Sequence, residues 1–87
     1  MKIILKGWTR IWLNGSFKGA SKRFSCDGMI CHAIINKGYI SIHKMPDEND
    51  DNSKTIHVLF KVSVVNLMRF FSPIQAAEIF EIYRLLN

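Results

Sequence analysis

Three turn-forming dipeptides divide the first half of the chain into segments typical of β-strands. They are Asn14-Gly15, Asp27-Gly28 and Lys37-Gly38. Asn-Gly and Asp-Gly tolerate the positive φ angles of two-residue hairpin turns, and such turns join neighbouring antiparallel strands. We therefore predict a meander of hairpins, with Gly7 as a bend or bulge in its first strand. The predicted strands cover residues 2–13, 16–26, 29–36 and 39–45.

Two-residue turns also fix which residues stand opposite each other, and therefore which side chains share a face of the sheet. With Lys37-Gly38 as a turn, Ile35 opposes Ile40 and His32 opposes His43. The Asp27-Gly28 turn extends the same apolar face into the preceding strand. The predicted apolar face consists of Phe24, Cys26, Met29, Cys31, Ala33, Ile35, Ile40 and Ile42.

Beyond the meander, an acidic segment over residues 46–54 predicts an exposed loop. From Thr55 onward, apolar and polar residues alternate, which is typical of a half-buried strand. Ile56, Val58, Phe60 and Val62 would form its buried face. The opposite face would carry Thr55, His57 and Lys61.

The C-terminal quarter predicts two helices, over residues 64–71 and 73–86. Ser72 is a suitable N-cap, Pro73 fits the first helical position, and Gln75 completes a capping box. We therefore predict a single α+β domain over residues 1–87, mainly β over 1–63 and α-helical over 64–87. Its antiparallel sheet of about five strands would be covered on one face by a short and a long helix.

Positive charge is concentrated at the start of the chain, which has a net charge of +5. All Lys and Arg residues before Asp27, the first acid, are interleaved with Trp and Phe. Cations can contact phosphates and flat rings can stack on bases, so this composition favours a polyanionic partner. The predicted nucleic-acid-binding residues are Lys2, Lys6, Trp8, Arg10, Trp12, Phe17, Lys18, Lys22, Arg23 and Tyr39.

The register of the first hairpin decides where these aromatic residues lie. The Asn14-Gly15 turn sets Trp12 against Phe17, and uninterrupted alternation places both on the face opposite to the apolar one. A bulge at Gly19 would instead send them, together with Trp8, to the core face. Without the bulge, one open platform would carry Trp8, Arg10, Trp12, Phe17, Arg23, His32, Tyr39 and His43.

Metal and catalytic signals are weak. The two cysteines and three histidines lack the close pairing typical of structural zinc sites, so we predict no metal and no cofactor. A disulfide between Cys26 and Cys31 is disfavoured in a reducing compartment. His32 and His43, opposed near Arg10 or Arg23, offer a remote alternative of metal-free ribonuclease chemistry by a general base and acid.

The last helix has more apolar surface than one contact with a sheet covers. This predicts either a helix sunk between other elements or a partner or homodimer interface at Phe80, Tyr83 and Leu86. No apolar run is long enough to span a bilayer or form a signal-peptide core, so the predicted location is the cytoplasm, with no membrane partner.

Taken together, the sequence favours a non-enzymatic module that binds RNA or single-stranded DNA through its basic, aromatic N-terminal region. An acidic protein surface is the other partner that its charge suits. The rival function is a small protein-binding regulator or inhibitor that uses the apolar C-terminal helix. High Ile, Lys and Asn content suggests an AT-rich genome, such as that of a phage.

Overall fold

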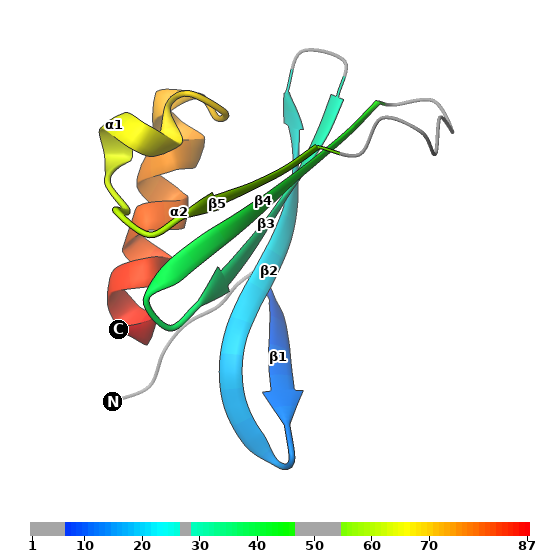
Figure 1. Cartoon of the computed structure of the whole chain (residues 1–87), viewed down its shortest axis with the longest axis vertical. Helices are drawn as coiled ribbons and strands as arrows, with labels where there is room; N and C mark the ends of the chain where they lie inside the picture. Colours follow the sequence, from blue (N-terminus) through cyan, green and yellow to red (C-terminus); the bar gives the residue numbers. More distant parts are fainter. Residues whose placement is uncertain (1–6, 27–28, 47–54) are drawn as a thin grey trace.

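The fold is a single antiparallel sheet with helices on one side (Figure 1). The structure, a computed structural model, describes residues 7–26, 29–46 and 55–87. The strands lie in the sheet in the order in which they occur in the chain, as expected for a meander of hairpins. The strands are β1 (Thr9–Leu13), β2 (Ser16–Cys26), β3 (Met29–Asn36), β4 (Tyr39–Pro46) and β5 (Thr55–Leu59).

Two helices, α1 (Val64–Leu67) and α2 (Pro73–Leu86), cover one side of this sheet. We call this side the helix face and the opposite side the open face. The predicted α+β architecture, with five antiparallel strands and a short and a long C-terminal helix, is therefore confirmed. Figure 1 also shows that the β1–β2 hairpin curves and extends past the end of the helical layer.

The core lies between the sheet and α2. Ile35, Ile40 and Ile42 are fully buried on the sheet side, and Leu67 and Ile79 are fully buried on the helical side. The paired positions in β2, β3 and β4 agree with the predicted register. Because removing each such side chain from water contributes roughly 1.5–3 kcal/mol, this apolar face is the main source of stability.

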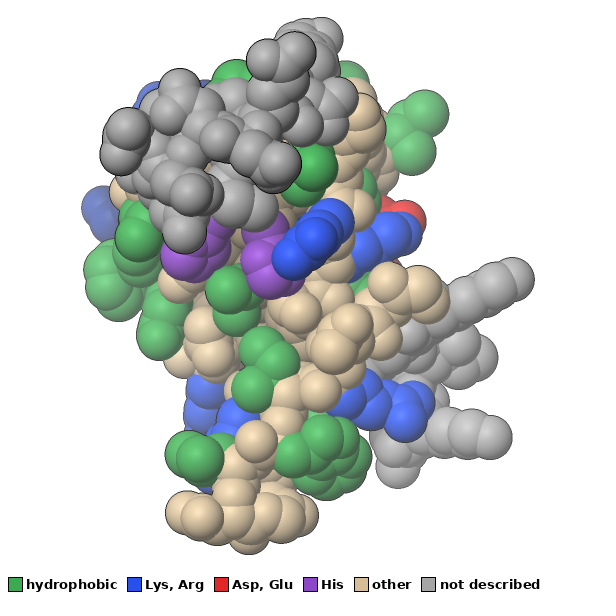
Figure 2. Space-filling view, turned by 90° about the vertical axis from the view of Figure 1, so that its right-hand side faces the viewer, with side chains coloured by type: hydrophobic (Ala, Val, Ile, Leu, Met, Phe, Trp, Pro, Cys, Tyr) green, Lys and Arg blue, Asp and Glu red, His purple; other side chains and the backbone are tan. Residues whose placement is uncertain are grey.

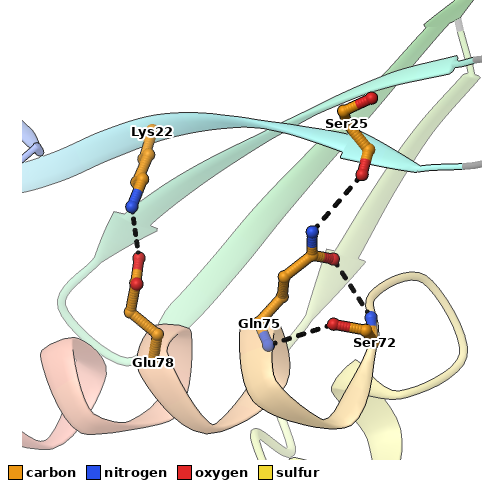
Figure 3. A network of polar contacts seen from close by, with 5 residues as sticks. All are labelled: Lys22, Ser25, Ser72, Gln75 and Glu78. Atoms are coloured by element: carbon orange, nitrogen blue, oxygen red, sulfur yellow. Dashed lines mark hydrogen bonds and ion pairs between the residues drawn. The ribbon is translucent and has the colours of Figure 1, made fainter.

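Polar contacts fix the start of α2 and its position on the sheet (Figure 3). The Ser72 hydroxyl accepts a hydrogen bond from the Gln75 amide at 3.2 Å, and Gln75 Oε1 accepts one from the Ser72 amide at 3.1 Å. This is the predicted capping box. Gln75 Nε2 also donates to the Ser25 carbonyl at 3.3 Å, which ties the helix to β2.

Several element boundaries differ from the prediction: β4 ends at Pro46 rather than at residue 45, and β5 ends at Leu59 although the predicted alternation continues to Val62. β1 begins at Thr9, after a bend in which Gly7 has a φ of 80°. The predicted start of this strand over residues 2–6 and the acidic loop residues 47–54 lie outside the described residues. α1 ends at Leu67 rather than at residue 71, and irregular turns connect it to α2.

The predicted faces of β5 were wrong, although Val62, beyond the end of the strand, packs against the core as predicted. Ile42 pairs with His57 and Ile40 with Leu59, so His57 and Leu59 face the helices. His57 lies against the Phe70 ring, with a centroid distance of 4.7 Å. Ile56, Val58 and Phe60 are therefore exposed rather than buried. The alternation identified the strand correctly, but an edge strand can keep apolar side chains in water when the core is filled by others.

Candidate nucleic-acid interface

A bulge in β2 decides which way the N-terminal aromatic residues point. Ile11 pairs with Gly19, but the next residue of β1, Trp12, pairs with Phe17. Lys18 is therefore the extra residue of a β-bulge. One extra residue reverses the face of everything beyond it, so the bulge moves the first hairpin's aromatic set from the open face to the helix face.

Trp8 is part of the core as a result. Its side chain is 8% exposed, and its ring meets Phe24 edge to face at a centroid distance of 5.9 Å. Lys22 Nζ lies 6.0 Å from the Trp8 ring centroid and forms an ion pair with Glu78 of α2 at 2.7 Å (Figure 3). Trp8 is therefore absent from the open platform that uninterrupted alternation predicts, whereas Lys22 faces the helices in either register.

Trp12, unlike Trp8, is not buried, because it lies on the part of the hairpin that extends past the helices. It is 58% exposed and contacts Phe17, with ring centroids 5.4 Å apart. Phe17 is half-buried against the core. Arg10 stands opposite Ala20, on the same side of β1 as Trp12, and is exposed.

A small cavity continues this surface. It has a volume of about 220 Å³, with Phe17 and Leu86 as its apolar wall and the exposed residues Lys18 and Lys37 as its cations. Lys37 comes from the β3–β4 turn, and the adjacent Gly38 amide donates to Asn87 Oδ1 at 2.8 Å, which joins the turn to the end of α2. We call Arg10, Trp12, Phe17, Lys18 and Lys37 the hairpin patch.

The remaining platform residues lie on the open face. Register places Arg23 opposite His32 and His32 opposite His43. The two imidazole centroids are 6.2 Å apart. Figure 2 views the open face and shows histidine side chains side by side with a Lys or Arg side chain next to them. At the far edge of the same face, Tyr39 contacts Phe60 with a centroid distance of 5.5 Å.

The structure thus divides the predicted binding residues into separate groups. Arg10, Trp12, Phe17 and Lys18 belong to the hairpin patch, and Arg23 and Tyr39 lie on the open face. Trp8 and Lys22 belong to the helix face, while Lys2 and Lys6 lie outside the described residues.

The acidic residues of the described part of the chain all lie on one element. Within the described ranges, the only acidic residues are Glu78 and Glu81, and both belong to α2. Glu78 is paired with Lys22, and Glu81 lies 3.8 Å from Arg84. No described carboxylate therefore pairs with a cation of the hairpin patch or of the open face, so both surfaces favour an anion.

Sequence reasoning missed Lys37 and Phe60. On sequence grounds Lys37 is only a turn residue, although the predicted register already places its turn beside the end of the β1–β2 hairpin. The alternation of polar and apolar residues predicts Phe60 in the core, but its side chain is exposed. Phe60 follows the last residue of β5, and beyond the end of a strand the alternation of faces no longer predicts which side chains are buried.

The described cysteine and histidine side chains considered as metal ligands or catalytic groups do not come together in one site. His57 and the buried Cys31 lie on the helix face, whereas His32 and His43 lie on the open face. Among the residues that the structure describes, no group of three or more His, Cys, Asp or Glu side chains could hold a metal ion. In the same part of the chain, no helix is long and apolar enough to cross a membrane.

The apolar side of α2 is largely used within the fold. Phe80 and Tyr83 stack with a centroid distance of 6.4 Å, and both are half-buried against the core, as is Leu86. The most exposed apolar residue of this helix is Ile74, at 84%. The predicted interface residues therefore support the helix packing, and an interface there would use only their exposed edges.

Comparison with known proteins gives no family assignment. No family model, no curated protein and no solved structure matches the chain. Functional reasoning therefore rests on the surfaces themselves.

Proposed function

We propose that this protein is a non-enzymatic module that binds single-stranded nucleic acid, RNA or DNA, through the hairpin patch. The observation that carries the proposal is an exposed Trp12 that lies on the same side of β1 as Arg10 and contacts Phe17, which lines a cavity together with Lys18 and Lys37. No described carboxylate belongs to this group. Trp12 would stack on a base, and the cations would contact the neighbouring phosphates. Sequence-tolerant binding of single strands commonly combines these two elements.

The shape of the hairpin patch supports a single strand more than a duplex. Trp12 and Phe17 form a tilted pair, which offers a ring face and a neighbouring apolar contact for an unstacked base. The cavity between Phe17 and Leu86 is small, and its two lysines stand at its rim. A flexible strand can place a base on a ring and a phosphate on a lysine at once, whereas bases within a duplex are already stacked.

The first prediction concerns salt. The logarithm of oligonucleotide affinity should fall linearly with the logarithm of salt concentration, with a slope of about 0.7 for each phosphate contacted on a single strand. Replacing Arg10 and Lys18 together by Ala should lower that slope by about 1.4 if each contacts one phosphate. Fluorescence anisotropy of a labelled oligonucleotide at several salt concentrations measures both quantities.

The matched control removes the same charge from residues outside the hairpin patch. Arg69 and Arg84 are exposed and belong to the helical layer, so replacing both by Ala changes the net charge equally. This double variant should keep nearly the wild-type slope. Equal losses in the two double variants would show that only net charge matters, and an absence of binding at low salt would remove the proposal.

A protein-binding regulator or inhibitor is the second candidate, and the exposed β5 residues favour it. Ile56, Val58 and Phe60 form a row of exposed apolar side chains on the open face, and Phe60 is 72% exposed. Such rows commonly mark protein interfaces. If the row joins two copies of the chain, Val58→Lys should convert a dimer to a monomer in light scattering without lowering the melting temperature. A wild-type mass that is already monomeric would exclude self-association.

A further inference from the structure

The open face has a second group of basic side chains that lies apart from the hairpin patch. Arg23, His32 and His43 come from β2, β3 and β4, and they occupy directly opposed positions across the three strands. We call these three residues the histidine row. Neighbouring strands lie about 4.8 Å apart, so three side chains at opposed positions converge over one small area of the sheet.

The surroundings of the row favour an anion. In the next row along the same face, Ser21 and Ser41 stand on either side of Ile34 and add two hydroxyl groups. Lys22 and Lys44, the sequence neighbours of Arg23 and His43, face the helices instead. On β5, the residue opposite His43 is the uncharged Ile56. Among the described residues, the titratable or charged groups facing His32 are therefore Arg23 and His43.

We propose that Arg23, His32 and His43 form a seat for a phosphate group, whose occupancy rises as the histidines become protonated. Arg23 would supply a permanent charge and a planar set of N–H donors, which suit phosphate oxygens. Each protonated imidazole would add one more N–H donor and one more charge. The seat is separate from the hairpin patch, and either could exist without the other.

The electrostatics of the free protein agree with such a seat. Burial lowers the pKa of His32 from its ordinary value of 6.5, and the positive charges of Arg23 and His43 lower it further. A phosphate between these groups would oppose the effect of both charges, so its binding should raise the histidine pKa values. By linkage, protonation of the histidines should strengthen phosphate binding by the same coupling free energy.

The lowered pKa of His32 also determines the direction in which stability changes with pH. The unfolded chain takes up the His32 proton near 6.5, whereas the folded chain takes it up only at lower pH. Without phosphate, the unfolded state therefore binds more protons in this window, and the free energy of unfolding should fall as the pH falls through 6.5. Phosphate should reduce that loss.

Proton NMR of the histidine rings tests the seat directly, because it follows each imidazole separately. Titrations in inorganic phosphate and in chloride at equal ionic strength should give higher pKa values in phosphate for His32 and His43. His57 packs on Phe70 on the helix face and should not change, so it is an internal control. Arg23→Gln should remove most of the phosphate effect. Equal pKa values in the two salts would overturn the proposal.

A second measurement asks whether the phosphate belongs to a nucleic acid. For a labelled single-stranded oligonucleotide, the salt slope should increase on acidification, by up to about 1.4 once both His32 and His43 carry a proton, because each then adds one charge. The double variant His32→Gln, His43→Gln should keep one slope as the pH falls, while His57→Gln should behave as wild type. A double variant with the wild-type pH dependence would overturn the seat for phosphodiesters.

The two proposals fail in different ways. Loss of oligonucleotide binding at every pH, together with a phosphate effect on His32 and His43, would reject the hairpin patch and assign the seat to free phosphate or a phosphate monoester. Oligonucleotide binding that depends on Arg10 and Lys18 but not on pH, with histidine pKa values equal in both salts, would reject the seat and keep the proposed function.

Discussion

Gly19→Ala should be among the most disruptive single-methyl additions in this protein. A Cβ atom at Gly19 would lie 2.2 Å from the Ile35 carbonyl oxygen, a backbone atom of the neighbouring strand. The strands would have to separate or the bulge would have to shift. Overpacking typically costs about 1–3 kcal/mol, and a clash with a backbone atom should lie at or above the upper end of that range. In a domain of this size each kcal/mol lowers the melting temperature by about 4–8 °C. Thermal unfolding followed by circular dichroism measures the change.

Gly15→Ala is the matched control, since it adds the same methyl group with a different consequence. Gly15 has a φ of 76°, and a Cβ atom there would meet nothing within 4 Å beyond its own chain neighbours. Its cost should come only from the left-handed backbone, about 1–2 kcal/mol. If Gly19→Ala cost no more than Gly15→Ala, the close approach of β2 to β3 at the bulge would be wrong.

The β2–β3–β4 part of the sheet was predictable from its turns. Gly38 of the β3–β4 turn has positive φ, as do Asn14 and Gly15 of the β1–β2 turn, whereas the predicted Asp27-Gly28 turn between β2 and β3 lies outside the described residues. The predicted partners Phe24 with Cys31, Ile35 with Ile40 and His32 with His43 are confirmed by the observed register. Short-range turn chemistry fixed these pairs, so no knowledge of the tertiary structure was needed.

The position of the bulge was harder to predict, because a β1–β2 hairpin with the bulge and one without it can both be closed by the Asn14-Gly15 turn. An uninterrupted β2 places Phe17 with Arg23 on the open face, whereas the extra residue Lys18 separates them. What decides between them is tertiary: with the bulge, Trp8 fills space beside Phe24, whose ring in turn contacts Phe71 in the helical layer. A helix that follows much later in the chain leaves no local signal in the hairpin.

The faces of β5 were mispredicted for a related reason. Alternation distinguishes two faces of a strand but does not say which one is buried. His57 occupies the helix face because Phe70 provides a ring for it to contact, and Leu59 fills the core beside Ile40. The candidate sites changed accordingly, since this inversion leaves Phe60 next to Tyr39 on the open face.

The two tryptophans provide the second large test, because the structure assigns them opposite roles. Trp8 is buried against Phe24, so Trp8→Ala should leave a cavity and cost about 3–5 kcal/mol of folding free energy. Trp12 is exposed, and Trp12→Ala should remove only its contact with Phe17, about 0.5–1.5 kcal/mol. Urea unfolding of both variants, with Trp8→Phe as a conservative control, measures the difference.

Binding should show the reverse order. If a base stacks on Trp12, Trp12→Ala should cost about 1–3 kcal/mol of oligonucleotide affinity, which is roughly five- to 150-fold. Trp8→Phe should retain affinity at a temperature where it is folded, because the Trp8 ring lies within the core. In the folded wild type, acrylamide should quench the Trp12 emission and largely spare that of Trp8. Large stability losses in both alanine variants, with unchanged affinity in Trp12→Ala, would instead make the hairpin a purely structural element, because Trp12 would then serve packing and not a ligand.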